Sequence, residues 1–217
     1  MSAHAEALGH GHDDHGHDEH HGPPLANKSS RLDPTIFGML LFIASEAMLF
    51  GSFFAAYFFA RVAVDHPEGW PPFRPGTEEH FHLPVYLALI NTIILVTSSF
   101  TAHWATTAIK KDQRAGVIGG LLLTFFLGLA FLLVQAREYS HIGFSPRDEA
   151  FGSTFYALTG LHGVHVFMGL SLLLMTLVRA MRGHYSSKNH LGMELPIIYW
   201  HFVDVMWIIV YVTVYVL

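Results

Sequence analysis

The fold is decided by one stretch of sequence, Thr35-IFGMLLFIASEAMLFGSFFAAYFF-Ala60, which carries one carboxylate, Glu46, in an otherwise apolar run. At about 1.5 Å per residue this run makes a helix of about 39 Å, enough to cross a hydrocarbon layer of about 30 Å. Counted from Thr35, Glu46 lies about 16 Å along the helix, close to the bilayer midplane. A carboxylate at that depth costs roughly 2.5–3.5 kcal/mol. The stretch therefore predicts a membrane helix whose Glu46 has a protein partner or a function.

The composition extends this prediction to the whole chain. Of its 217 residues, 52% are hydrophobic and only 13% are charged, whereas soluble domains have about 25% charged residues. The predicted membrane spans are residues 35–60, 84–109, 115–136, 151–178 and 196–217. Each is long enough for a helical span and lacks the alternation of a membrane β-barrel. We expect an all-α membrane protein, a bundle of five transmembrane helices.

The positive charges predict the orientation of this bundle. Five spans place the two termini on opposite sides of the membrane. With the N-terminus inside, the inner segments hold Lys28, Arg31, Lys110, Lys111, Arg114, Arg179, Arg182 and Lys188, and the outer loops hold Arg61, Arg74, Arg137 and Arg147. The inner excess of Lys and Arg predicts an N-terminus inside and a C-terminus outside.

Residues 1–34 form a separate region rich in histidine, acidic residues and glycine. Nothing in it can build a core, so we expect a disordered cytoplasmic tail. An alternative is loose binding of copper, zinc or nickel, because neutral imidazole suits these ions. The histidines concerned are His10, His12, His15, His17, His20 and His21. Their irregular spacing argues against one defined metal site.

The fourth span contains two histidines, His162 and His165, three residues apart and therefore on one helical face. Their depth is comparable to that of Glu46, so a hydrogen bond between Glu46 and His162 is an option. Two histidines are an incomplete metal ligand set, and haem ligation would need an axial partner. A structural role for both histidines is the favoured interpretation.

The last span contains a further possible pair, His201 and Asp204, about one turn apart. A helical projection puts one polar and aromatic face toward protein, made of Trp200, Asp204, Trp207, Tyr211 and Tyr215. The opposite face, predicted to contact lipid, consists of Phe202, Met206, Ile209 and Val210. Interface or anchoring roles are predicted for Trp200, Trp207, Tyr211, Arg137 and Glu138, and His103 is a candidate polar contact.

Several kinds of chemistry are excluded. The chain has no cysteine, which excludes disulfides, thiolate metal sites and cysteine nucleophiles. It has no nucleophile with a neighbouring base, no phosphate-binding glycine loop and no nucleic-acid platform. No residue is therefore predicted to be catalytic.

Four segments together carry a family resemblance. They are LFIASEAMLFGSFFAAYFFAR (41–61), LLVQAREYSHIGFSPRDEAFGSTFY (132–156), LTGLHGVHVFMGL (158–170) and YWHFVDVMWIIVYVTVY (199–215). In order and spacing they resemble subunit III of haem–copper oxidases, and cytochrome c oxidases more than quinol oxidases. The longer members of that family have seven helices. This chain resembles their last five, as in the bacterial five-helix form.

The resemblance implies an accessory subunit without a redox centre in a proton-pumping cytochrome c oxidase. Haems and copper would reside in subunits I and II. The chain would pack mainly on subunit I, contact subunit II and small subunits, bind structural phospholipids, support proton uptake and reside in the bacterial cytoplasmic (inner) membrane. A respiratory supercomplex is a further expected assembly. Glu46 matches the family's intramembrane carboxylate, which reacts with carbodiimides.

Three alternatives stay open from the sequence. The chain could serve a quinol oxidase or a nitric oxide reductase. It could be a cytochrome b-like electron carrier that uses His162, His165 and His201. A stand-alone proton channel is the third, although the polar groups do not form a continuous series along one helix.

Overall fold

The computed structural model describes residues 33–63, 70, 84–147 and 149–217. The chain divides into two units, Met1–Asp33 and Pro34–Leu217. The predicted tail and its histidines lie outside the described residues. The second unit contains the helices α1 (Pro34–Ala63), α2 (Val85–Lys110), α3 (Arg114–His141), α4 (Glu149–Met181) and α5 (Leu191–Tyr211), and α5 continues into a π-helical turn, η1 (Val212–Val216).

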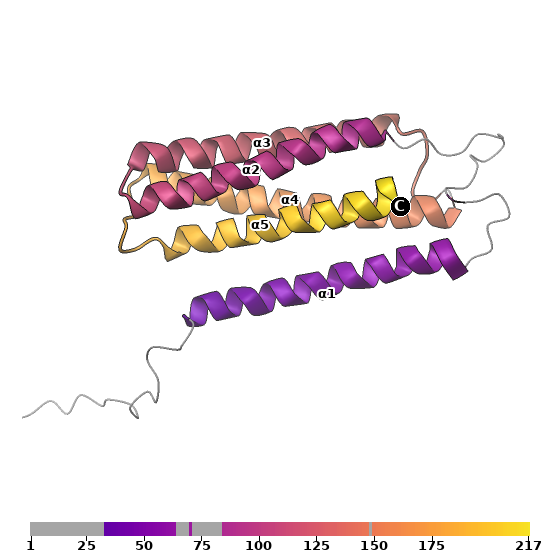
Figure 1. Ribbon diagram of the computed structural model, residues 1–217, viewed down its shortest axis with the longest axis horizontal. Helices are drawn as coiled ribbons and strands as arrows, with labels where there is room; N and C mark the ends of the chain where they lie inside the picture. The colour runs from indigo at the N-terminus through magenta and orange to yellow at the C-terminus, as the bar shows by residue number, and fades with distance from the viewer. Residues whose placement is uncertain (1–32, 64–69, 71–83, 148) are drawn as a thin grey trace, which may run out of the picture. The chain divides into compact units, whose positions relative to one another are not determined.

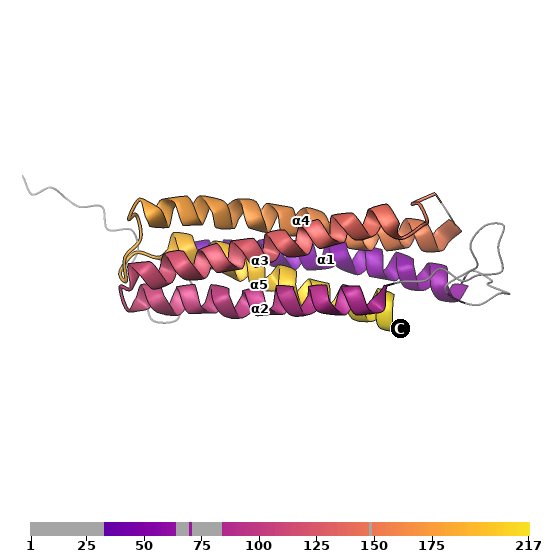
Figure 2. The same ribbon diagram turned by 90° about the horizontal axis from the view of Figure 1, so that it is seen from above.

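The prediction of an all-α membrane protein is confirmed. Five helices are long and apolar enough to cross a membrane, and the described residues contain no strand beyond a single bridge between Ser186 and Asn189. Helices α2, α3, α4 and α5 pack as a four-helix bundle, in which α2 contacts α3 and α5, and α4 contacts α3 and α5. Helix α1 lies along α4 and α5, outside these four (Figures 1 and 2).

The bundle has two distinct ends. The connections from α2 to α3 and from α4 to α5 lie at one end, which we call the Lys110 end (Figure 1). The chain terminates at the other end, which we call the Leu217 end. Pro34 begins α1 at the Lys110 end, so α1 and α5 run in the same direction.

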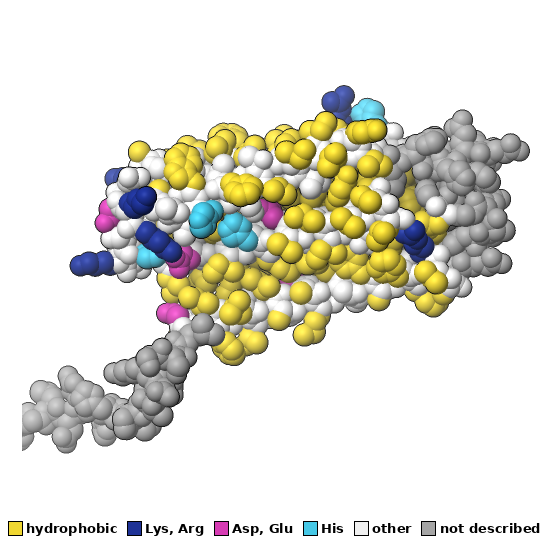
Figure 3. Space-filling view, in the orientation of Figure 1, with side chains coloured by type: hydrophobic (Ala, Val, Ile, Leu, Met, Phe, Trp, Pro, Cys, Tyr) yellow, Lys and Arg dark blue, Asp and Glu magenta, His cyan; other side chains and the backbone are white. Residues whose placement is uncertain are grey.

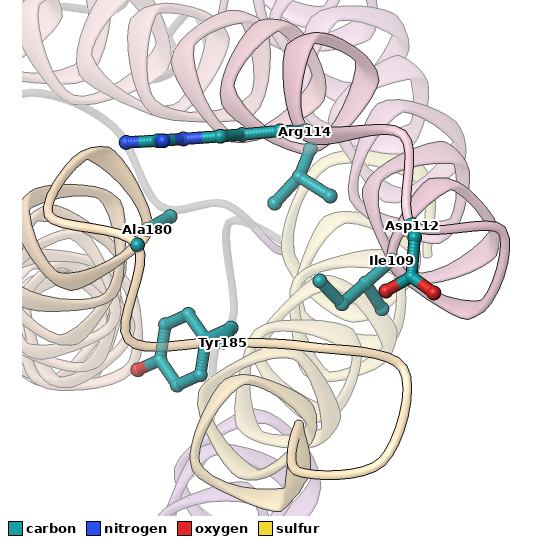
Figure 4. Close-up of a pocket in the computed structure, with 7 residues that line it drawn as sticks. Ile109, Asp112, Arg114, Ala180 and Tyr185 are labelled. Carbon is teal, nitrogen blue, oxygen red and sulfur yellow. The ribbon is translucent and has the colours of Figure 1, made fainter.

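The two connections at the Lys110 end are bonded to each other beside a small pocket (Figure 4). Asp112 accepts hydrogen bonds from the backbone N–H (2.9 Å) and the hydroxyl (2.7 Å) of Ser187. These two bonds hold the pKa of Asp112 below its usual range, and the bond from the hydroxyl has the larger effect. Arg114 reaches across a small cavity of about 60 Å³ and donates to the carbonyl of Met181 at the end of α4. The turns are therefore fixed by side-chain bonds between separate helical hairpins.

The centre of the bundle is the indole of Trp200, which is fully buried. Its Nε1 donates to Ser98 Oγ on α2 at 2.9 Å. The ring fits between two glycines, Gly128 on α3 and Gly169 on α4. A Cβ added at these positions would lie 2.5 Å from Trp200 Cη2 and 2.8 Å from Trp200 Cε3, respectively. One α5 side chain therefore contacts all three of the other bundle helices.

Not every glycine or small residue serves such a contact. The glycines at 160 and 163 have no heavy atom within 4 Å of an added Cβ. The same holds for Gly38, and Ser45 and Ser52 on the same face of α1 are exposed. No other described helix of this chain approaches this face of α1 closely.

Replacing Gly128 with Ala should destabilise the bundle by roughly 1–3 kcal/mol, because Trp200 is held from both sides and cannot move away from the added methyl. The measurement is the thermal unfolding of the purified protein. Gly160→Ala is the matched control, since its methyl meets open space. Equal melting temperatures for the two variants would contradict this packing.

Candidate functional site in the membrane interior

The carboxylate of Glu46 on α1 pairs with His165 on α4. Nε2 of His165 lies 2.7 Å from Oε2 of Glu46, and the two side chains are 5% and 20% exposed, respectively. The other ring nitrogen, Nδ1, lies 2.7 Å from the carbonyl of Leu161. This pair connects α1 to the four-helix bundle close to the middle of both helices.

The contacts of His165 define the proton content of this pair. A carbonyl oxygen only accepts hydrogen bonds, so Nδ1 carries the proton that it shares with Leu161. Nε2 and Glu46 then share one further proton. It gives either an imidazolium with a carboxylate or a neutral imidazole with a carboxylic acid. In both forms the pair has no net charge, which suits an apolar environment.

The hydrogen bond considered between Glu46 and His162 does not form. His162 is fully buried and lies among aromatic rings, with centroid distances of 4.8 Å to Trp207 and 5.7 Å to Phe131. Neither of its nitrogens has a hydrogen-bond partner among the described residues. Side chains three residues apart on a helix point in directions about 60° apart, which is enough to give them different neighbours. His162 therefore faces the bundle centre, whereas His165 faces α1.

A second polar cluster joins α2 and α5. Ser99 donates a short hydrogen bond to Oδ2 of Asp204 and lies 3.0 Å from Nδ1 of His201. Asp204 is buried, whereas Ser99 and His201 are partly exposed. His103, one turn from Ser99, is exposed. The predicted pairing of His201 with Asp204 occurs through Ser99, which the sequence reading did not single out.

The polar face predicted for α5 is turned inward. Trp200, Asp204, Trp207 and Tyr215 are buried, and Tyr211 is partly buried against Tyr215. Nε1 of Trp207 donates to Thr92 on α2 at 2.9 Å. The predicted lipid face was partly wrong: Ile209 is exposed and Phe202 is half-buried, but Met206 and Val210 are buried. The reason is that α5 contacts α1, α2 and α4 and has little surface left for lipid.

A third polar cluster lies toward the Leu217 end of α3. Glu138, predicted as an interface residue, is buried and accepts a hydrogen bond of 2.8 Å from Tyr215. Gln135, one turn earlier, is also buried and was missed. The signal for it was present, because the buried positions of α3 follow a repeat of three and four residues. The positions in this repeat are 117, 121, 124, 128, 131, 135 and 138, and Gly120 is also buried.

Arg137 is exposed beside this cluster. It lines a surface hollow of about 360 Å³ with Leu87, Val134, Glu138 and His141. A second hollow, of about 290 Å³, lies between α3 and α4, and its lining is almost wholly apolar. The residues of the second hollow include Leu132, Gly160, Gly163 and Phe167.

The described residues contain no group of three or more His, Asp or Glu side chains arranged to hold a metal ion. The polar groups inside the membrane instead form pairs and small clusters between helices. Such an arrangement joins helices and can hold a proton. It offers no set of ligands that converges on one point.

Comparison with known proteins identifies the family of this chain. The family model for cytochrome c oxidase subunit III matches residues 29–217. A cytochrome c oxidase subunit 3 from Thermostichus vulcanus is 42% identical over 186 residues, which cover 85% of this chain and 88% of the relative. The subunit 3 of Drosophila yakuba is 41% identical, over 82% of this chain and 67% of the relative. That of Mus musculus is 38% identical, over 90% of this chain and 72% of the relative.

Membership of this family implies that the chain is a membrane subunit of a respiratory oxidoreductase complex, associates with the other oxidase subunits and holds no catalytic cofactor of its own. The match covers the five helices, the three polar clusters or pairs described above and all of the described residues. This chain belongs to the cytochrome c oxidase subunit III family.

Proposed function

We propose that this chain is a non-redox accessory subunit of a proton-pumping terminal oxidase that passes electrons from cytochrome c to oxygen. In this role it stabilises subunit I, binds phospholipid and supports proton uptake, and the haems and copper belong to subunits I and II. The curated relatives, named cytochrome c oxidase subunit 3, favour cytochrome c over quinol as the electron source.

The observation that carries this proposal is the Glu46–His165 pair. It places one shareable proton in the membrane interior between two helices, with no net charge. A pair of this kind can exchange a proton with a neighbouring subunit and also fix α1 to the bundle. Neither role requires a redox centre in this chain.

The geometry of the histidines disfavours a cytochrome b-like carrier. His165 uses both ring nitrogens, on Glu46 and on the Leu161 carbonyl. His162 is enclosed by the rings of Trp207, Phe131 and Phe50. A haem between them would displace this packing, so a structural role for His162 fits better.

Two surface hollows support the proposed lipid binding. The apolar hollow between α3 and α4 is open at Gly160 and Gly163, where side chains are absent, and suits an acyl chain. The hollow at the Leu217 end carries Arg137, a cation suited to a phosphate group. We propose that these hollows hold structural phospholipids.

The Glu46→Gln substitution separates the two proposed roles of the Glu46–His165 pair, proton exchange and the attachment of α1 to the bundle. A Gln amide can still donate to Nε2 of His165, but it carries no transferable proton. We expect the assembled Glu46→Gln oxidase to keep its initial turnover and the packing of α1, and to lose activity faster during sustained turnover. The measurement is oxygen consumption followed over time, together with proton uptake.

Glu46→Leu is the matched control, because it removes the hydrogen bond as well. It should weaken the attachment of α1 by about 1 kcal/mol, the usual range for hydrogen bonds between membrane helices. An assembled Glu46→Gln complex with no initial turnover would refute the accessory role.

His162→Phe should leave the haem spectrum and haem content of the purified oxidase unchanged. The substitution replaces a buried ring without hydrogen bonds among the described residues by an apolar ring of similar size. Stability should stay equal or rise, since two unsatisfied buried nitrogens are removed. Loss of a haem band from an assembled complex would instead favour the electron-carrier function.

The proposed location is the bacterial cytoplasmic membrane, with the Lys110 end on the cytoplasmic side. The chain contains no cysteine, so single cysteines report orientation without interference. In intact cells a membrane-impermeant thiol reagent should label Arg147→Cys and spare Lys111→Cys. The reverse labelling pattern would invert the proposed orientation.

A further inference from the structure

One group of side chains is not used by the function proposed above. Ser99 and His103 on α2 lie near His201 and Asp204 on α5 where these two helices pack. His103 is exposed, Ser99 and His201 are partly exposed, and Asp204 is buried. We call these four residues the α2–α5 polar patch. Figure 3 shows histidine side chains on the bundle surface, between the charged groups at the Lys110 end and the hydrophobic middle.

The patch lies within the membrane, on the outside of the bundle. His103 is seven residues, or about 10 Å, from the Lys110 end of α2. Helix α2 is 26 residues long, about 39 Å, and exceeds a hydrocarbon thickness of about 30 Å by some 9 Å. When the extra length is shared equally between the two ends of α2, about 4 Å of each end lies outside the hydrocarbon. His103 then lies about 6 Å inside the hydrocarbon.

The internal bonds of the patch define what it offers to a neighbour. The hydroxyl of Ser99 donates to Asp204, so its oxygen accepts from His201. Nδ1 of His201 therefore carries the proton, and Nε2 of the neutral ring is a hydrogen-bond acceptor. Nε2 of His201 and the ring of His103 make no hydrogen bond within the described part of the chain. Lipid chains cannot supply these bonds.

The surroundings favour a protein neighbour over a lipid headgroup. The patch is bordered by large exposed apolar side chains, Phe100 and Trp104 on α2 and Val205 and Ile208 on α5. A polar centre within an apolar border is typical of contacts between membrane helices. A headgroup would have to enter the hydrocarbon to reach His201, which is deeper than His103 along its own helix.

We propose that the α2–α5 polar patch is the docking surface for a transmembrane helix of another oxidase subunit. That helix presents a hydrogen-bond donor, such as a Ser, Thr, Tyr, Asn or Arg side chain, to His201 and His103. The inference rests on the proposed function, because it requires the chain to be assembled in an oxidase. The inference specifies which face of this chain contacts the other subunit and which kind of side chain the partner helix presents.

The test places a photo-crosslinking amino acid in the assembled complex, at Phe100 beside the patch or at Phe167 on α4. These two side chains are 72% and 64% exposed and serve as a matched pair. Illumination of membranes containing the oxidase should join position 100 to another oxidase subunit. Position 167 should give mainly lipid adducts, since it borders the hollow proposed to hold lipid.

A second pair of variants tests the surface without a probe. Val205→Trp adds bulk beside the patch, and Leu174→Trp adds an indole on α4, where Leu174 is also exposed and lines neither surface hollow. Val205→Trp should reduce the amount of this chain that co-purifies with the haem-containing subunits at least tenfold more than Leu174→Trp does.

The outcomes separate the inference from the proposed function. If the wild-type chain co-purifies with the oxidase but position 100 joins only lipid and Val205→Trp assembles normally, the docking surface is refuted and the function stands. If the wild-type chain does not co-purify with any haem-containing subunit, the proposed function fails and the docking inference fails with it.

Discussion

Hydrogen bonds between side chains on different helices are the interactions on which this bundle depends. Inside a bilayer no water is present to satisfy a polar group, so each one requires a protein partner. Ser98 on α2 accepts from Trp200 on α5, and Thr92 on α2 accepts from Trp207. Because the hydrophobic effect does not drive helices together inside a bilayer, these bonds and close van der Waals packing together select which helices are neighbours.

Helix α1 shows this constraint most clearly. Only Phe50, Tyr57 and Ala60 of its side chains are buried, so its apolar contacts are few. Its polar contacts include one with α4, through Glu46 and His165, one in which Trp70 donates to the hydroxyl of Tyr57, and one in which Arg61 donates to the carbonyl of Leu217. Glu46, whose carboxylate would be unfavourable in the bilayer without a partner, is therefore the main specific link between α1 and the other helices.

The sequence predicted the elements well and their contacts less well. The lengths of the apolar stretches were sufficient to predict the five helices. The position of Glu46 along its stretch was sufficient to predict that it lies at the depth of the two histidines in the fourth span. Depth does not fix rotation about a helix axis, so the choice between His162 and His165 depended on where α1 packs. The same limit explains Met206 and Val210, which are buried because α5 is surrounded by neighbours. Gln135 was predictable from the repeat on α3, whereas Ser99 resembles many serines in membrane helices.

The central claim is that the Glu46–His165 pair holds α1 against α4. It is tested most directly by the distance between spin labels on cysteines placed at Leu40 on α1 and Met175 on α4, both of which are exposed. Labels at Phe126 on α3 and Met175 report the rest of the bundle. We predict that Glu46→Leu broadens the first distance distribution, that Glu46→Gln leaves it narrow, and that neither changes the second. An unchanged distribution between α1 and α4 in Glu46→Leu would contradict the account.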